Sequence, residues 1–309
     1  MVDLSTSLGR LQLPAPVLTA SGCAAAGKEL DNYFDITEIG GIVTKSIMVE
    51  PRSGRPTPRM AETPSGMLNS IGLQGPGIES FLEHDLKWLR ERGARSIVSI
   101  AGNNVAEFGR LARRLWNVDG VSAIEVNISC PNVANRGLVF ACHLGSAQEV
   151  MAEVRRNAPT GVPLLAKLSP DVTDIVEIAR GVVEAGADGL SLINTLLGMV
   201  IDPVTLRPKL GGRTGGLSGP AIRPVAVRAV YQVHAALPKA PILGMGGIRS
   251  GKDALEFFAA GASAVSVGTA IFNDPSAPIR IQRELAQELE SRGIDRLQDV
   301  IGIAHKELA

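Results

Sequence analysis

Polar side chains of several chemical types follow short apolar runs of this sequence. The runs end in Lys45 and Ser46, in Asn127 and Cys130, in Lys167, and in Asn194 and Thr195. A thiol can act as a base when its pKa approaches the working pH, an ammonium can hold an anion, and amides donate and accept hydrogen bonds. Each residue alone is more often a turn former or inert core. Their repetition at the ends of several runs predicts one shared site.

Eight apolar runs, each followed by a segment of helical periodicity, must position these residues. The runs cover residues 16–22, 41–47, 96–102, 123–130, 164–170, 189–195, 241–247 and 264–271. Helices are expected at 78–92, 105–116, 147–157, 172–185, 221–236, 252–259 and 278–292, with a short one near 30–39. Runs that are apolar on both faces and separated by helices indicate a parallel sheet. Eight such units favour an α/β fold of the (β/α)8 TIM-barrel type, with an open doubly wound sheet as the alternative.

Three segments stand outside this repeat. Residues 4–13 are typical of an N-terminal hairpin that closes one end of the barrel. Residues 48–77 and 196–219 are longer than ordinary connections, and both follow predicted strands. We therefore expect them to be long binding loops over the C-terminal face, where barrel active sites lie. Residues 1–309 are expected to form a single domain.

The last two predicted strands end in glycine rather than in large polar side chains. GMGGI contains Gly246 and Gly247, and VGTAI contains Gly268 and Thr269. Backbone N–H groups without side chains can approach an anion closely, and the loops after barrel strands seven and eight commonly bind phosphate. Simple turn glycines would give the same letters. Two such loops on adjacent strands predict a phosphorylated ligand.

Composition limits the classes of partner. Lys plus Arg and Asp plus Glu both number 31, so neither nucleic acid nor an anionic membrane is an expected partner. Three widely spaced cysteines, Cys23, Cys130 and Cys142, without a CxxC motif, indicate reduced thiols in the cytoplasm, and no metal site is expected. The first ten residues are unlike a signal peptide, and no apolar run is long enough for a membrane span.

Motifs spread along the chain resemble those of one enzyme family. They are Lys45-Ser46, MLNSIGLQGPG (67–77), EVNISCPN (125–132), AKLSP (166–170), INTLLGMVID (193–202), GGLSGPAIRP (215–224), GMGGI (244–248) and VGTA (267–270). In this order they resemble the dihydroorotate dehydrogenases of pyrimidine biosynthesis, and most of all the NAD-linked class 1B catalytic subunits. The resemblance implies an FMN-dependent oxidoreductase that converts (S)-dihydroorotate to orotate in de novo UMP synthesis.

The resemblance also implies roles for individual residues. The catalytic base would be Cys130. The FMN contacts would be Ser21, Lys45, Ser46, Asn127, Lys167, Ile193, Gly219, Gly246, Gly247, Gly268 and Thr269. The substrate contacts would be Lys45, Asn69, Ser70, Ile71, Gly72, Leu73, Asn127, Asn194 and Thr195. Lys167 would place positive charge beside the flavin edge that becomes negative on reduction. Two departures from the family pattern are Ser99, where Asn is usual, and RGLVFACHLG (136–145), which lacks the usual Phe-Gly pair.

The route of the electrons is predicted from what the sequence lacks. It has no GxGxxG turn between a strand and a helix, and three scattered cysteines are too few for an ordinary iron–sulfur cluster. Together with the class 1B resemblance, this implies a partner subunit that carries FAD and an iron–sulfur cluster and passes electrons to NAD, around a homodimeric core. The alternatives are a class 1A-like fumarate-dependent enzyme, a dihydropyrimidine dehydrogenase-like enzyme, and a non-catalytic phospholigand-binding barrel.

Overall fold

Eight parallel strands form a closed barrel. The computed structural model describes residues 2–129 and 142–306. The ring strands are β3 (Val17–Thr19), β4 (Ile42–Val43), β7 (Ser96–Ile100), β8 (Val121–Asn127), β9 (Leu164–Lys167), β10 (Gly189–Leu192), β13 (Ile242–Met245) and β14 (Ala264–Val267). Neighbours pair in the order β3-β14-β13-β10-β9-β8-β7-β4, and a parallel bridge between Leu18 and Gly41 joins β3 to β4. The predicted barrel is confirmed, and the open sheet is not.

Helices connect the strands and cover the outside of the barrel. They are α1 (Ile78–Ser80), the π-helical stretch η3 (Phe81–Leu86), α2 (Lys87–Arg92), α3 (Val105–Arg114), α4 (Leu144–Asn157), α5 (Ile175–Glu184), α6 (Arg223–Ala236), α7 (Gly251–Ala260), α8 (Ala270–Asn273) and α9 (Ala277–Glu290). Short 3-10 turns lie at η5 (Pro220–Ile222), η6 (Leu297–Asp299) and η7 (Ile303–His305). In the part of the chain that the structure describes, no helix is long and apolar enough to cross a membrane.

Capping side chains decide where several helices begin. The Asp174 carboxylate accepts hydrogen bonds from the backbone N–H groups of Val176 and Glu177, so α5 begins later than the predicted residue 172. The predicted helix at 30–39 was wrong, because this segment forms two 3-10 turns, η1 (Leu30–Asn32) and η2 (Ile36–Glu38). The Asp35 side chain accepts from the backbone N–H of Thr37 and starts the second turn separately.

A small apolar core fills the N-terminal end of the barrel. It consists of Leu8, Leu13, Leu18, Val43, Ile97, Ala123, Leu165, Leu243, Met245 and Ala264. Leu8 and Leu13 come from the antiparallel hairpin β1 (Thr6–Leu8) and β2 (Leu11–Leu13). The hairpin therefore closes the N-terminal end of the barrel, as predicted, and leaves the polar residues of the strands at the opposite end.

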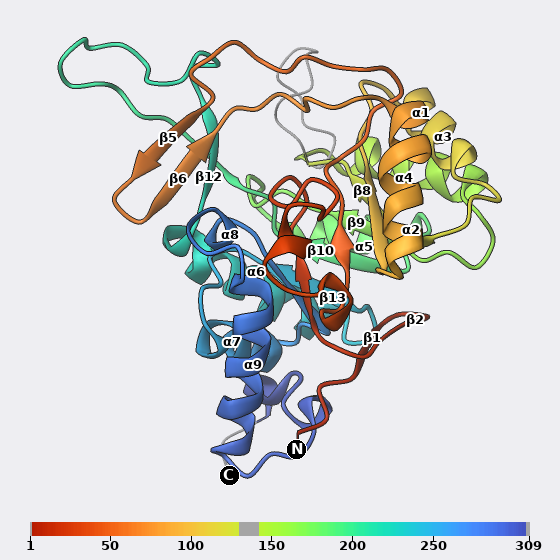
Figure 1. The fold of residues 1–309 in the computed structure, drawn as a ribbon, viewed down its shortest axis with the longest axis vertical. Helices are drawn as coiled ribbons and strands as arrows, with labels where there is room; N and C mark the ends of the chain where they lie inside the picture. The colour runs from red at the N-terminus through yellow and green to blue at the C-terminus, as the bar shows by residue number, and fades with distance from the viewer. Residues whose placement is uncertain (1, 130–141, 307–309) are drawn as a thin grey trace.

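The two long connections form a second sheet that the sequence did not predict. Strands β5 (Met60–Thr63), β6 (Gly66–Asn69), β11 (Leu196–Gly198) and β12 (Gly215–Ser218) pair antiparallel in the order β11-β12-β6-β5. We call these four strands the cap sheet. Figure 1 shows β5, β6 and β12 together, well away from the β1–β2 hairpin. The two long connections lie over the C-terminal face as expected, and backbone pairing between distant segments stabilises strands in them whose glycines obscure the strand pattern.

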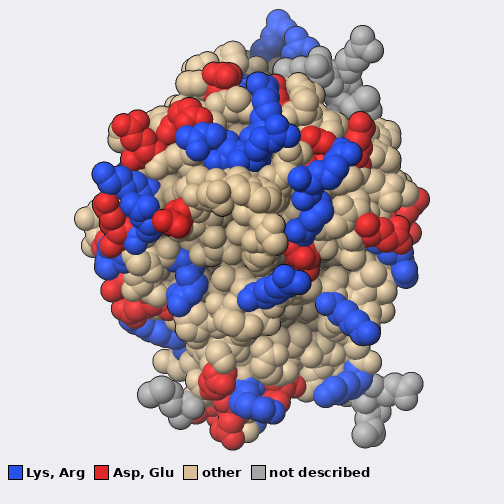
Figure 2. All heavy atoms as spheres, turned by 90° about the vertical axis from the view of Figure 1, so that its right-hand side faces the viewer, with Lys and Arg blue, Asp and Glu red and all other residues tan. Residues whose placement is uncertain are grey.

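Charged side chains of both signs lie on the face of the protein that Figure 2 draws. On the face drawn in Figure 2, Lys and Arg side chains are interspersed with Asp and Glu rather than gathered by sign. This distribution agrees with the equal numbers of basic and acidic residues, 31 of each. A surface of this kind produces little long-range attraction for a polyanion.

Candidate functional site

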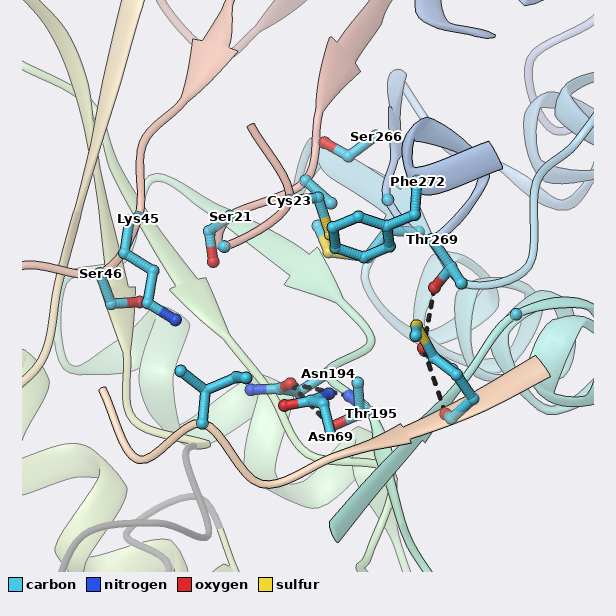
Figure 3. Close-up of a pocket in the computed structure, with 18 of the residues that line it drawn as sticks. Ser21, Cys23, Lys45, Ser46, Asn69, Asn194, Thr195, Ser266, Thr269 and Phe272 are labelled. Carbon is cyan, nitrogen blue, oxygen red and sulfur yellow. Dashed lines mark hydrogen bonds between the residues drawn. The ribbon is translucent and has the colours of Figure 1, made fainter. Parts of the chain in front are cut away.

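A cavity of about 1050 Å³ lies between the C-terminal ends of the barrel strands and the cap sheet. Among the predicted site residues, its lining includes Ser21, Lys45, Ser46, Asn69, Ile71, Gly72, Leu73, Asn127, Lys167, Ile193, Asn194, Thr195, Gly219, Gly246, Gly247, Gly268 and Thr269. Figure 3 shows Lys45 and Ser46 on one side, Thr269 and Phe272 on the other, and Asn69, Asn194 and Thr195 grouped together. The cavity is large enough for a mononucleotide cofactor and a small substrate.

One predicted residue of the described chain, Ser70, is not part of this lining. Ser70 is fully buried, and its Oγ accepts a hydrogen bond of 3.1 Å from Nη1 of Arg55 rather than facing the cavity. Cys130, predicted as the base, lies outside the described residues. Ser99, noted as a departure from the family pattern, is fully buried behind Ser46 and does not line the cavity.

Lys167, at the end of β9, is paired with a buried carboxylate. Its Nζ lies 3.4 Å from Oε1 of Glu125 and 3.2 Å from Oγ of Ser21. Glu125 belongs to β8 and is fully buried inside the barrel. A buried ammonium is strongly destabilising without such a partner. Glu125 therefore compensates the charge that Lys167 brings to the cavity.

The sequence held a signal for Glu125 that the prediction did not use. Glu125 stands two positions before Asn127 in a strand, so the two side chains point to the same face. Because Asn127 was predicted to point into the site, Glu125 had to lie beneath it, inside the barrel. A carboxylate there needs a cationic or donor partner, and Lys167 on the next strand was the nearest candidate.

A chain of hydrogen bonds leads from Glu125 to the side chain of Asn127. Oγ of Ser99 donates to Oε1 of Glu125 at 3.0 Å, and Oγ of Ser46 lies 2.9 Å from Oγ of Ser99. Nδ2 of Asn127 then donates to Oγ of Ser46 at 2.9 Å. These four residues come from three segments that are distant in the sequence, namely β8, β7 and the residues after β4, and they form one buried polar layer above the apolar core of the barrel.

The amides that were predicted to contact substrate are themselves hydrogen-bonded to one another. Nδ2 of Asn194 donates to Oγ of Ser129 at 2.7 Å and to Oδ1 of Asn127 at 3.3 Å. Oγ of Ser129 donates to the same Oδ1 at 3.0 Å. Oδ1 of Asn194 accepts from the backbone N–H of Thr195 at 2.7 Å. Ser129 was missed from the sequence, although it lies inside the NISCPN motif.

The glycine loops form the opposite wall. Gly247 has a φ of +76°, and a Cβ atom there would lie 2.6 Å from the carbonyl oxygen of Gly219. Oγ1 of Thr269 donates to Oγ of Ser218 at 2.8 Å. Oγ of Ser266, also in the lining, is buried and has no hydrogen-bond partner among the described residues. Exposed backbone N–H groups with a nearby free hydroxyl suit a phosphate.

The two described cysteines have raised thiol pKa values. Burial raises the pKa of Cys23, in the cavity wall, to about 11, against the opposing effect of Lys167 and Lys45. Burial, and secondarily the charge of Asp171, also raises the pKa of Cys142. A thiol accepts a proton only in its ionised form, and the raised pKa values disfavour that form at both positions. Within residues 2–129 and 142–306, no three His, Cys, Asp or Glu side chains come together as a metal site.

Comparison with known proteins gives a consistent set of relatives. Residues 3–289 match the family model described as Dihydroorotate dehydrogenase. The chain is 50% identical over 300 residues to a Geobacter protein (strain M21) named dihydroorotate dehydrogenase B (NAD(+)), catalytic subunit, which covers 97% of each chain. Proteins of the same name are 50% identical over 304 residues in Desulforamulus reducens (98% of this chain, 99% of the relative) and 46% identical over 308 residues in Geobacillus sp. strain WCH70 (99% and 97%).

Proposed function

The chain belongs to the dihydroorotate dehydrogenase family, and on that premise we propose that it oxidises (S)-dihydroorotate to orotate in de novo pyrimidine (UMP) biosynthesis, with FMN bound in the cavity. The observation that carries the proposal is the meeting of a buried ammonium, a network of neutral amides and a glycine-lined wall around one cavity. A uracil-like ring needs both donors and acceptors, and amides supply both.

The residues of the cavity fit FMN. The wall formed by Gly246, Gly247 and Gly268 would hold the phosphate through backbone N–H groups, and the hydroxyl of Ser266, which has no partner among the described residues, is available to a ligand. Lys167 would lie near the part of the ring system that gains negative charge on reduction. When bound, FMN supplies a hydride acceptor for C6 of dihydroorotate.

Substrate binding is assigned to the amide network and the neighbouring loop. Asn69, Asn127, Asn194 and Thr195 offer donors and acceptors to the amide edges of the ring, and Lys45 offers positive charge to the carboxylate. Ile71, Gly72 and Leu73 line the same side of the cavity. Because Ser70 is bonded to Arg55, its contribution would be to hold this loop in place.

Cys130 is proposed as the base that removes the C5 proton of dihydroorotate. The assignment rests on its place in the NISCPN motif, directly after Ser129, since Cys130 lies outside the described residues. The thiol must be ionised to accept the proton. The raised pKa values of Cys23 and Cys142 support the choice of Cys130 among the three cysteines.

We also propose that the chain works with a second subunit. The relatives are named as catalytic subunits of an NAD(+) enzyme, which supports an electron-transfer partner that carries FAD and an iron–sulfur cluster. In this proposal residues 1–309 form a single FMN-binding domain. Two copies of the chain form the core of the complex, and the complex lies in the cytoplasm.

The test is the absorbance spectrum of the purified chain after addition of FMN. The protein should be yellow, and anaerobic dihydroorotate should bleach it faster than dihydrouracil does. The reduced chain should then reduce a dye rapidly, and NAD only after the partner subunit is added. A colourless protein, faster bleaching by dihydrouracil, or fumarate as the best acceptor would overturn the respective part of the proposal.

A further inference from the structure

The buried carboxylate of Glu125 contacts both Lys167 and the hydrogen-bond chain that leads to Asn127. Oε1 of Glu125 bonds to Lys167 on one side and to Ser99 on the other. Oε2 is buried and has no hydrogen-bond partner among the described residues. A carboxylate bonded through one oxygen is less stabilising in a protein interior than a well-packed apolar side chain of similar volume. Packing alone therefore does not account for a glutamate at this position.

We propose that Glu125 is a positioning residue with two effects, one on the charge at Lys167 and one on the orientation of the Asn127 amide. The inference rests on the proposed function for the identity of the two ligands, FMN and orotate. Glu125 itself is fully buried and does not line the cavity, so it acts through its neighbours.

The first effect is electrostatic. The side chains of Lys167 and Glu125 are 5% and 0% exposed, so water screens their charges very little. A ligand in the cavity meets the field of an ion pair rather than that of an isolated ammonium. Reduced FMN, which carries the additional negative charge, is then stabilised less than it would be by an uncompensated lysine. Glu125 should thus keep the reduction potential of bound FMN low.

The second effect follows from counting protons along the chain. An ionised carboxylate can only accept, so Ser99 must give its hydroxyl proton to Glu125. Ser99 can then only accept from Ser46, and Ser46 can only accept from Nδ2 of Asn127. The negative charge of Glu125 therefore sets which group donates in each hydrogen bond between Glu125 and Asn127.

This direction determines what the amides present to a ligand. With Nδ2 of Asn127 committed to Ser46, Oδ1 faces Asn194 and accepts from its Nδ2. The backbone N–H of Thr195, which can only donate, holds Oδ1 of Asn194 in the matching orientation. A side chain that donates at position 125 would permit the reverse direction and the opposite orientation of the Asn127 amide. Glu125 thereby selects one pattern of donors and acceptors.

Three variants separate the two effects. Glu125→Gln removes the charge and adds a donor at nearly constant volume. Glu125→Asp keeps the charge, and Ser99→Ala cuts the chain to the amides without touching the pair of Glu125 with Lys167. Asp188→Asn is the matched control, because this carboxylate pairs with Arg155 and accepts from the backbone N–H of Leu164, at the N-terminal ends of the strands.

Two measurements are made on the flavin-loaded proteins: the reduction potential of FMN, and the dissociation constant of orotate from the change in flavin absorbance. Glu125→Gln should raise the potential by about 30 mV or more, which is a tenfold change in the relative binding of reduced and oxidised FMN. It should also raise the dissociation constant of orotate about tenfold, as expected for one reversed or lost hydrogen bond. Ser99→Ala should raise the dissociation constant of orotate by about the same factor and leave the reduction potential of FMN unchanged.

The conservative and control variants complete the test. Glu125→Asp should keep the potential near that of the parent protein, and Asp188→Asn should change neither quantity. A Glu125→Gln protein that binds FMN with parental potential and parental orotate affinity would overturn the inference. If Glu125→Gln does not fold, Ser99→Ala decides, since a shifted potential or unchanged orotate affinity would contradict the scheme. A parent protein that binds no FMN would instead refute the proposed function.

Discussion

Lys167→Ala should destabilise the protein far more than the loss of an ordinary lysine, because it leaves Glu125 buried without its counter-charge. Two unit charges 3.4 Å apart attract by about 5 kcal/mol at an effective dielectric constant of about 20. Removing one partner of a buried pair costs about 3–5 kcal/mol in general. We therefore expect the free energy of unfolding to fall by about 3–5 kcal/mol.

Urea unfolding of the flavin-free protein measures this loss without a contribution from FMN binding. The double variant Lys167→Ala with Glu125→Gln should recover at least half of the lost stability, since no uncompensated charge is left. Lys252→Ala provides the control, because the Lys252 side chain is 74% exposed in its ion pair with Glu288 and should contribute less than about 1 kcal/mol. A loss below about 1 kcal/mol for Lys167→Ala, or a double variant as unstable as the single one, would refute the reasoning.

Three further predictions concern the glycine wall and the cysteines. Gly247→Val should yield largely flavin-free protein by absorbance, because its Cβ would lie 2.6 Å from the Gly219 carbonyl oxygen, whereas Gly161→Val, also at a positive φ but in open space, should retain flavin. Cys130→Ala should bind FMN yet slow its reduction by dihydroorotate by about 10²–10⁴-fold in stopped-flow measurements; near-normal rates would exclude Cys130 as the base. Because the folded-state pKa of Cys23 is raised from 9.0 to about 11, its stabilising contribution is complete below pH 9 and is lost as pH rises toward 11. Cys23→Ala should therefore lose less stability than the parent protein between pH 9 and 11 in urea titrations, and parallel losses would contradict the shift.

The barrel could be predicted from sequence because its strands carry a local signal. Runs such as residues 164–170 and 264–271 are apolar on both faces, and a helix follows each of them. The N-terminal hairpin was predicted separately, from residues 4–13, which stand outside this repeat. The cap sheet could not be predicted in this way, since β12 is Gly215–Ser218 and pairs with a strand from the other long connection. Only tertiary contact makes such a segment a strand.

The candidate site shows a similar division. Residues at strand ends, such as Lys167 and Asn194, were predicted because polar groups there point to a common mouth. Glu125 was not, because a glutamate in a strand ordinarily indicates a solvent-exposed position. Its partners Ser99 and Lys167 lie 26 and 42 residues away in the sequence, so neither is evident from local pattern. Family resemblance supplied the motifs around it without assigning Glu125 a part.

The cap sheet also has a consequence for the nascent chain. Asn69 in β6 pairs with Gly216 in β12, and these residues are 147 positions apart. One wall of the cavity is therefore incomplete until more than two thirds of the polypeptide has left the ribosome. The glycines near the ends of β13 and β14 emerge later still. A half-synthesised chain therefore lacks both the paired cap sheet and the glycine wall that line the cavity.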